Sequence, residues 1–413
     1  MPEFTSLPPE LLVDILELAH EPFVHTNVCW IFNQIATPIL YRRVSLYFSY
    51  KAHGIHLFLR TIISRPSLGN CVQCLFADPY DPVGEPGYIP PSRGNLPGFV
   101  AEAALHGLST EIQQAIGDGS IPAMLFLLLC YLPRLQTFQL PLPERGRDSG
   151  IFYQQMSITS SLPSGLRSVR SVRLSPWATN KLTWEMIVPF LRLPSLQRFL
   201  CINGIANLGL NEISHPLPGS SRIEHIEFQS CEIHNDMLGT LVRSSRLLRT
   251  FVYKVRSSTI IHPPPLGDAL RQYALSTLEC LEVTHSDNLS IDSFGPLSGF
   301  TRLAHIKISL SLLLGGPNGE TTNTIACRLS TTLPVSLISL YLLIDSAWKS
   351  VSIGPVAEWF VKNRHERLNY LRNIAICGYI EDSERQRLES LCMAEGLEIL
   401  PRYWNTGILF GCV

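Results

Sequence analysis

One spacing of apolar residues recurs from about residue 66 onward: apolar, two others, apolar, two others, apolar, one other, apolar. The last three apolar positions of the instances are Cys71/Cys74/Phe76, Leu135/Phe138/Leu140, Val169/Val172/Leu174, Leu196/Phe199/Cys201, Ile223/Ile226/Phe228, Leu248/Phe251/Tyr253, Leu278/Leu281/Val283, Leu303/Ile306/Ile308, Leu337/Leu340/Leu342 and Leu371/Ile374/Ile376. From Phe138 to Ile374, successive middle residues are 34, 27, 27, 25, 30, 25, 34 and 34 positions apart. Such a register predicts a solenoid, in which each unit buries its apolar edge against its neighbours.

Each instance of the spacing predicts a strand followed by a helix. The apolar-x-apolar ending has period two, which is the period of a short β-strand. Amphipathic segments between the strands predict helices at Trp184–Leu193, Asp236–Arg246, Leu266–Ala274 and Pro355–Asn363. This succession resembles the leucine-rich repeat, so the expected fold class is α/β, with a parallel β-sheet on the concave face of the solenoid. The alternative is a general α/β domain in which the spacing is coincidental.

One position of the repeat departs from the regular pattern. Regular leucine-rich repeats have an asparagine or cysteine three residues beyond the strand, where it bonds buried backbone groups. Cys231 is the one residue of this type here, whereas other units have Trp177, Gly204, Ser286 or Asp345. We therefore expect an irregular solenoid.

The remaining segments predict loops and further helices. Asp78–Gly98 holds six prolines and four glycines, too many for a regular element, and predicts a long loop. Helical patterns are present at Ala101–Leu132 and Glu381–Glu395. Shorter loops are predicted at Pro141–Gly150, Ser214–Ser221, His262–Pro265 and Gly315–Gly319.

The N-terminal segment has a different pattern. Two prolines, Pro8 and Pro9, occupy a predicted first helical turn, where the backbone amides have no intrahelical partner. The apolar residues Leu11, Leu12, Ile15, Leu16 and Ala19 follow at helical spacing. A second apolar run contains Val28, Ile31, Phe32 and Ile35 and is expected to end at Pro38.

Residues Leu7–Leu46 resemble the F-box, and their opening and their "IATPILYRRVSLY" ending are similar to F-box proteins of mushroom-type fungi. The F-box is the helical module that docks substrate receptors onto the Skp adaptor of cullin–RING ubiquitin ligases, and irregular leucine-rich repeats follow many F-boxes. The chain is a few residues shorter than the family pattern between His20 and Val28. The resemblance implies an adaptor-binding module at residues 1–50, a solenoid at 51–400 with a Pro/Gly-rich loop at 78–98, and a tail at 401–413. The alternative is an ordinary amphipathic hairpin that caps the domain.

The resemblance implies a non-enzymatic substrate receptor that binds a Skp-type adaptor, and through it a cullin, and presents an unknown target protein to the ligase. The alternative function is an interaction scaffold with a degenerate F-box. The residues expected to contact the adaptor are Leu7, Pro8, Leu11, Leu12, Ile15, Leu16, Val28, Ile31 and Phe32.

Composition narrows the possible partners. With 33 basic and 34 acidic residues, the net charge of −1 gives no global attraction to nucleic acid or to anionic membranes. The longest apolar run, Ala123–Leu132, is too short to span a bilayer. Eleven cysteines scattered through apolar segments are typical of reduced thiols, which favours a cytoplasmic or nuclear protein.

No motif predicts a catalytic centre, a metal site or a cofactor. Cys71 and Cys74 resemble half of a zinc site, but no second pair stands at a matching spacing. Gly315–Gly319 lacks the lysine and hydroxyl residue of a phosphate-binding loop, so a turn is expected. Arg167, Arg170 and Arg173 follow one strand and its approach, where they form either a contact for an acidic partner or merely a solvated face.

The repeat register also predicts a binding face. The residue between the last two apolar positions, and the residue before them, should point away from the core onto the strand face. From these positions, the residues expected to contact a target protein are Arg173, Arg198, Glu227, Glu282, Lys307 and Tyr341.

Overall fold

The computed structural model describes residues 30–47, 54–78, 96–142, 156, 162–176, 181–206, 219–255, 263–284, 292–317, 319–348, 351, 353–378 and 382–399. The chain divides into two compact units, unit 1 at Met1–Phe199 and unit 2 at Leu200–Val413. The division lies within strand β6 (Arg198–Ile202).

Unit 1 alternates helices with parallel strands in the order β1-β2-β3-β4. Its strands are β1 (Arg43–Tyr47), β2 (Cys74–Asp78), β3 (Thr137–Leu142), β4 (Ser171–Pro176) and the short β5 (Leu182–Thr183). Its helices are α3 (Trp30–Arg42), α4 (Gly54–Ser64), α5 (Pro66–Gly69), α6 (Leu96–Leu105), α7 (Thr110–Gly117), α8 (Ile121–Cys130), α10 (Ser164–Arg167) and α11 (Trp184–Leu191).

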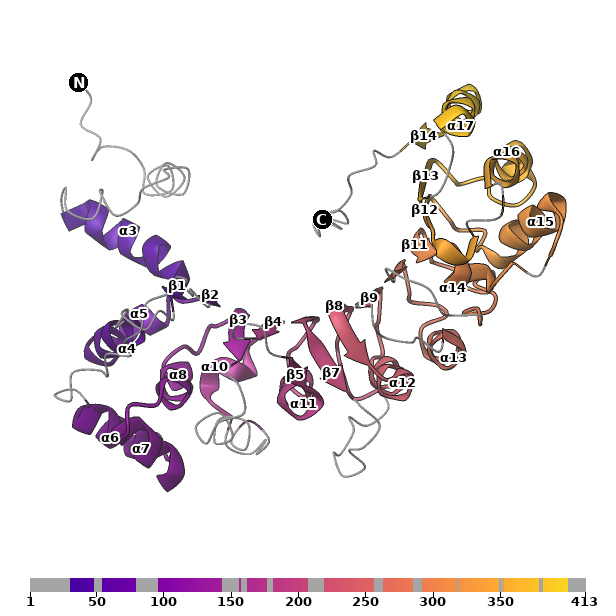
Figure 1. Cartoon of the computed structure of the whole chain (residues 1–413). Coiled ribbons are helices and arrows are strands. Elements are labelled where there is room, and N and C mark those ends of the chain that lie inside the picture. Colours follow the sequence, from indigo (N-terminus) through magenta and orange to yellow (C-terminus); the bar gives the residue numbers. More distant parts are fainter. Residues whose placement is uncertain are drawn as a thin grey trace, which may run out of the picture. The chain divides into compact units, whose positions relative to one another are not determined.

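Unit 2 continues the same plan with parallel strands in the order β8-β9-β10-β11-β12-β13-β14 (Figure 1). Its strands are β7 (Gly204–Ala206), β8 (His225–Ile233), β9 (Thr250–Val255), β10 (Cys280–Thr284), β11 (His305–Ser309), β12 (Ser339–Ile344), β13 (Asn373–Gly378) and β14 (Glu398–Ile399). Its helices are α12 (Asn235–Ser244), α13 (Pro263–Tyr273), α14 (Leu310–Leu314), α15 (Thr322–Thr332), α16 (Ile353–Asn363) and α17 (Asp382–Ala394), with 3₁₀ turns η4 (Ser346–Trp348) and η5 (Arg364–Glu366). Figure 1 shows these helices on one side of the strands.

The repeat register is confirmed from β3 onward. In unit 2 the middle apolar residues lie directly opposite one another across neighbouring strands, in the row Ile226, Phe251, Leu281, Ile306, Leu340 and Ile374. Every middle residue from Phe138 to Ile374 is at most 2% exposed. Because side chains alternate along a strand, this fixed row places one face of each strand in the core.

In the first repeat the structure differs from the predicted register. We expected Cys71, Cys74 and Phe76 to be buried, but the buried residues are Val72, Leu75 and Ala77. Leu75, and not Cys74, pairs with Phe138 of β3. The same apolar spacing exists one residue further along, and a shift of one residue exchanges the two faces of a strand.

The structure differs from three further predictions about helices and loops. The region Ala101–Leu132 is helical, but Gly107 and Gly119, both with positive φ, separate α6, α7 and α8. The prolines of the predicted loop His262–Pro265 instead begin α13, where a first helical turn tolerates the missing N–H groups. Helix α3 does not end at Pro38 but continues to Arg42.

The parallel sheet begins within the segment that resembles an F-box. Strand β1 pairs with β2, with Val44 opposite Leu75. The sheet therefore starts at Arg43, before residue 51. Of the residues expected to contact the adaptor, Ile31 and Phe32 lie in α3. The other seven, Leu7, Pro8, Leu11, Leu12, Ile15, Leu16 and Val28, lie outside the described residues.

Two side chains act at the position where regular repeats have asparagine or cysteine. The thiol of Cys231, which is fully buried, accepts a hydrogen bond from the backbone N–H of Gly204 (3.1 Å) and can donate to the carbonyl of Cys201 (3.4 Å). Asp345 accepts hydrogen bonds from the N–H groups of Ser311 (3.0 Å) and Ala347 (3.1 Å). Each residue therefore satisfies a backbone group of the preceding repeat, although only Cys231 was expected to do so.

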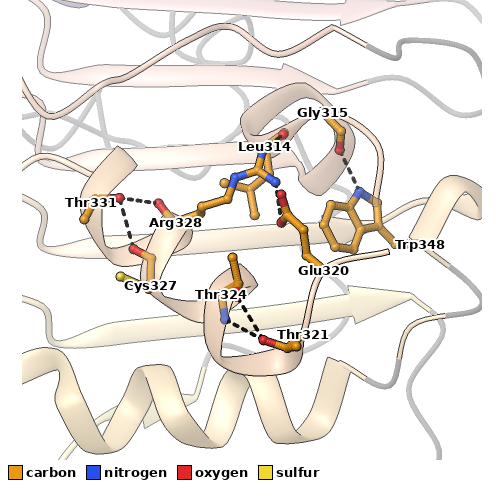
Figure 2. A network of polar contacts seen from close by, with 9 residues as sticks. All are labelled: Leu314, Gly315, Glu320, Thr321, Thr324, Cys327, Arg328, Thr331 and Trp348. Carbon is orange, nitrogen blue, oxygen red and sulfur yellow. Dashed lines mark hydrogen bonds and ion pairs between the residues drawn. The ribbon is translucent and has the colours of Figure 1, made fainter. Parts of the chain in front are cut away.

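The predicted turn at Gly315–Gly319 connects α14 to α15, and Figure 2 shows how it is anchored. Gly315 and Gly319 have φ angles of 79° and 70°, which favour glycine. The indole N–H of the buried Trp348 donates to the carbonyl of Gly315 (3.2 Å). Arg328 of α15 binds the carbonyl of Leu314 and pairs with Glu320 (2.5 Å). These contacts hold α15 to the end of α14.

Candidate protein-binding face

Four of the predicted target-binding residues occupy one row of the strand face in unit 2. The strand pairings place Glu227, Val252, Glu282, Lys307 and Tyr341 directly opposite one another, from β8 to β12. Neighbouring strands are about 4.8 Å apart, so each side chain reaches the next one in the row. The structure therefore brings together these four residues, as the repeat register predicted.

The charged residues of this row form a balanced network. The carboxylate of Glu282 lies 2.9 Å from the ammonium of Lys307 and 3.4 Å from that of Lys254. The same Lys307 ammonium lies 5.1 Å from the ring centroid of Tyr341, which is a cation–π contact. The thiol of Cys377, on β13, can donate to the Tyr341 hydroxyl (3.0 Å).

Glu227 begins the row and has its own hydrogen-bond partners. The side-chain amide of Gln229 donates to its carboxylate (2.6 Å), and the Nε2 atom of His225 lies 3.3 Å away. Burial alone would raise the pKa of Glu227. The hydrogen bonds of His225 and Gln229 and the charges of His225 and Lys254 outweigh burial, so the pKa lies below the ordinary value for glutamate.

The row is less exposed than the sequence suggested. Glu227, Glu282 and Tyr341 are only 8%, 6% and 8% exposed. The long side chains of adjacent strands cover one another, and their mutual contacts take the place of water. Because each of these three residues is buried and partnered, a substitution there should cost more stability than a typical surface substitution.

The contacts of Glu227 predict how the stability of the chain depends on pH. Because the folded-state pKa of Glu227 is depressed, the unfolded chain takes up a proton at this site before the folded chain does. The stability from Glu227 is thus present above about pH 4.3, the ordinary value, and is lost as the pH falls through the folded-state pKa. We expect the urea midpoint of the wild type to fall more between about pH 6 and about pH 3.5 than that of Glu227→Gln. Parallel curves would contradict this role of the network.

Arg173 and Arg198 belong to a different environment in unit 1. Arg173 lies on β4, opposite Gln139 of β3, and Arg198 begins β6. Both side chains are exposed. Within the described part of the chain neither forms an ion pair, in contrast to Glu227, Glu282 and Lys307 of unit 2.

The register argument missed Lys254 and Gln229. Both residues lie two positions beyond the row, on the same face of β9 and β8, and they pair with each other across the two strands. The period-two alternation continues for one more step than the spacing used to choose the candidates. Extending the alternation to the end of each strand would have identified both residues.

The described residues were also compared with what a metal site, a disulfide framework and a membrane-spanning helix require. No group of three or more metal-ligating side chains gathers among them. The cysteines in the described ranges are free, with no disulfide bond between them. Of the helices in these ranges, none has the length and apolar character needed to cross a membrane.

Comparison with known families gives an assignment that agrees with this architecture. The family described as "leucine-rich repeat domain" matches residues 110–379. The chain therefore belongs to the leucine-rich repeat family, whose members generally bind protein partners. No curated protein matches the chain. The family and the strand face together indicate a role in protein interaction.

Proposed function

We propose that this chain is the substrate-recognition subunit of a Skp–cullin–F-box type ubiquitin ligase. In this proposal the N-terminal helices bind the Skp-type adaptor, the strand face of the solenoid binds a target protein, and the chain has no catalytic activity of its own. Two features support the proposal: the resemblance of Leu7–Leu46 to the F-box, and the leucine-rich-repeat solenoid that follows it.

The observation that carries the proposal is the direct connection of helix α3 to the solenoid. Helix α3 ends at Arg42, and β1 begins at Arg43 without an intervening loop. The carbonyl of Arg42 accepts a hydrogen bond from the N–H of Gln73 (3.0 Å), just before β2. A partner bound to α3 would therefore be held close to the solenoid.

Such a connection suits a receptor that works by proximity. A target bound to the solenoid gains a high effective concentration near the ubiquitin-conjugating enzyme, which other subunits carry. A long flexible linker would dilute this effect. The proposed adaptor contacts remain the nine residues of the F-box-like segment: Leu7, Pro8, Leu11, Leu12, Ile15, Leu16, Val28, Ile31 and Phe32.

Co-purification with a Skp-type adaptor tests the proposal. We expect the wild-type chain to retain the adaptor and the double variant Leu11→Glu/Ile15→Glu to lose it. The two residues share one predicted helix face, and a carboxylate buried there without a partner costs several kcal/mol, about enough to abolish binding. The matched control is Leu105→Glu/Val335→Glu, which adds the same two charges at side chains that are 81% and 52% exposed. The control should retain the adaptor.

The outcomes separate the proposal from its alternatives. Equal adaptor binding by both variants would contradict docking through this face. If the wild type retains no adaptor but retains other proteins, the chain is an interaction scaffold with a degenerate F-box, which the shortened segment between His20 and Val28 favours. If circular dichroism shows that Leu11→Glu/Ile15→Glu alone unfolds the solenoid, the segment is a capping hairpin.

A further inference from the structure

Unit 1 has a cluster of five exposed arginines on its strands and on the segments that lead into them, which we call the arginine face. Arg170 precedes β4, Arg173 lies within it, and Arg198 begins β6. Arg134 lies on the turn that leads into β3, and Arg167 is the last residue of α10, which precedes β4. All five side chains are exposed.

Backbone contacts show that the three central arginines lie on neighbouring segments. The N–H of Arg198 donates to the carbonyl of Arg170 (2.8 Å), and the N–H of Arg170 donates to that of Gln136 (2.8 Å). These contacts continue the parallel sheet, so the strands that carry the arginines are about 4.8 Å apart. The segments that lead into β3 and β4 are also tied together, because the Ser168 hydroxyl donates to the carbonyl of Leu135 (3.0 Å). The segments that carry the five arginines are therefore neighbours within unit 1.

Among the described residues, no acidic side chain pairs with these arginines. The segments Pro133–Leu142, Ser164–Pro176 and Arg192–Phe199, which form this surface, contain no aspartate or glutamate. Across the ranges that the structure describes, none of the five arginines takes part in an ion pair. The strand face of unit 2 differs, because there Lys254 and Lys307 share the carboxylate of Glu282. A strong local positive charge thus exists on a chain whose net charge is only −1.

We infer that the arginine face binds an acidic segment of a partner protein, by contacts between guanidinium groups and carboxylates. The inference rests on the proposed binding of a target by the solenoid, and it assigns the chemistry of that target. Arginine suits this role because its planar group makes paired hydrogen bonds to a carboxylate. The sheet fixes the spacing of the strands, so part of the ordering cost of binding is already met.

An acidic protein segment fits better than a nucleic acid. Non-specific nucleic-acid binding depends on many phosphate contacts and on a field that the nearly neutral chain lacks. Binding of single strands also uses exposed aromatic side chains as stacking platforms. The segments of the arginine face contain two phenylalanines, Phe138 and Phe199, and both are fully buried.

Fluorescence anisotropy with a labelled oligo-glutamate peptide and the full chain tests the inference. We expect Arg170→Glu/Arg173→Glu/Arg198→Glu to weaken peptide binding by about tenfold or more, and added salt to weaken binding to the wild type. The matched control is Arg222→Glu/Arg246→Glu/Arg367→Glu, which makes the same change in net charge at three exposed arginines of unit 2. The control should bind nearly as tightly as the wild type. The lysine triple variant, Arg170→Lys/Arg173→Lys/Arg198→Lys, should bind with intermediate affinity because it keeps the charge and loses the paired geometry.

Three results would overturn the inference. The first is equal loss in the two glutamate triples, which would mean that only net charge matters. The second is a wild type that does not bind the peptide. The third is tighter binding of a labelled single-stranded oligonucleotide that competes with the peptide, which would assign the face to nucleic acid. Adaptor co-purification of the same variants separates this inference from the proposed ligase role, because these substitutions leave the F-box-like segment unchanged.

Discussion

Phe251→Ala is expected to lower the free energy of unfolding of unit 2 by about 3–5 kcal/mol. The side chain is fully buried on β9 and lies between Ile226 of β8 and Leu281 of β10. Its removal leaves a cavity at the centre of the apolar row, where the parallel strands allow little local collapse. Because each repeat contacts only its neighbours, the loss should also weaken the interfaces on both sides. Urea denaturation followed by circular dichroism measures the change.

Leu247→Ala provides the control for Phe251→Ala. Leu247 precedes the same strand, is also large and apolar, and is 48% exposed. Its truncation should change stability by about 0.5 kcal/mol or less. Similar effects for the two variants would mean that the β9 row is not the core of unit 2.

Gly267→Ala is expected to destabilise the chain, although alanine favours helices. Gly267 lies in α13, and a Cβ atom added there would be 2.2 Å from the backbone oxygen of Phe294. A backbone atom cannot move aside as a flexible side chain can, so the helix must shift away from the segment that contains Phe294. Because the clash is with a backbone atom, we expect a cost at the upper end of the usual range for overpacking, about 3 kcal/mol, which exceeds the gain of about 1 kcal/mol in helix propensity.

Gly239→Ala is the matched substitution, and the expected change has the opposite sign. Gly239 lies in the neighbouring helix α12, and the nearest atom to an added Cβ is the Cβ of Ala269 at 3.5 Å, an ordinary contact. The variant should gain about 0.5–1 kcal/mol from the smaller entropy of its unfolded chain. The melting temperatures of the two variants, each compared with that of the wild type, test this contrast. A shift in the same direction for both variants would contradict the close packing at Gly267.

The repeat could be predicted from the sequence because it depends on local periodicity. The pairing of Ile226, Phe251, Leu281 and Ile306 follows from the spacing of apolar residues alone. The same reasoning failed at Cys71 and Cys74, where two alternative registers both fit the spacing and only the pairing of Leu75 with Phe138 distinguishes them. Short-range periodicity thus identifies strands well but does not always fix their faces.

The burial of the polar row could not be predicted in the same way. Whether Glu282 is exposed depends on Lys254 and Lys307, which approach it from the strands on either side. These contacts join residues that are 28 and 25 positions apart in the chain, and no local pattern encodes them. The close approach of Gly267 to Phe294 is likewise a property of the tertiary structure.

The uninterrupted strand register from β9 to β13 has a consequence for how this chain can change in length. Insertions can be absorbed in the connections, as the differing steps of 25 to 34 residues between middle positions illustrate. A single residue added inside one strand would instead move every following side chain of that strand to the opposite face of the sheet. Duplication or loss of a whole strand–helix repeat would leave the buried and outer faces of every other strand unchanged. The binding surface can therefore lengthen or shorten by complete units while the core pattern stays the same.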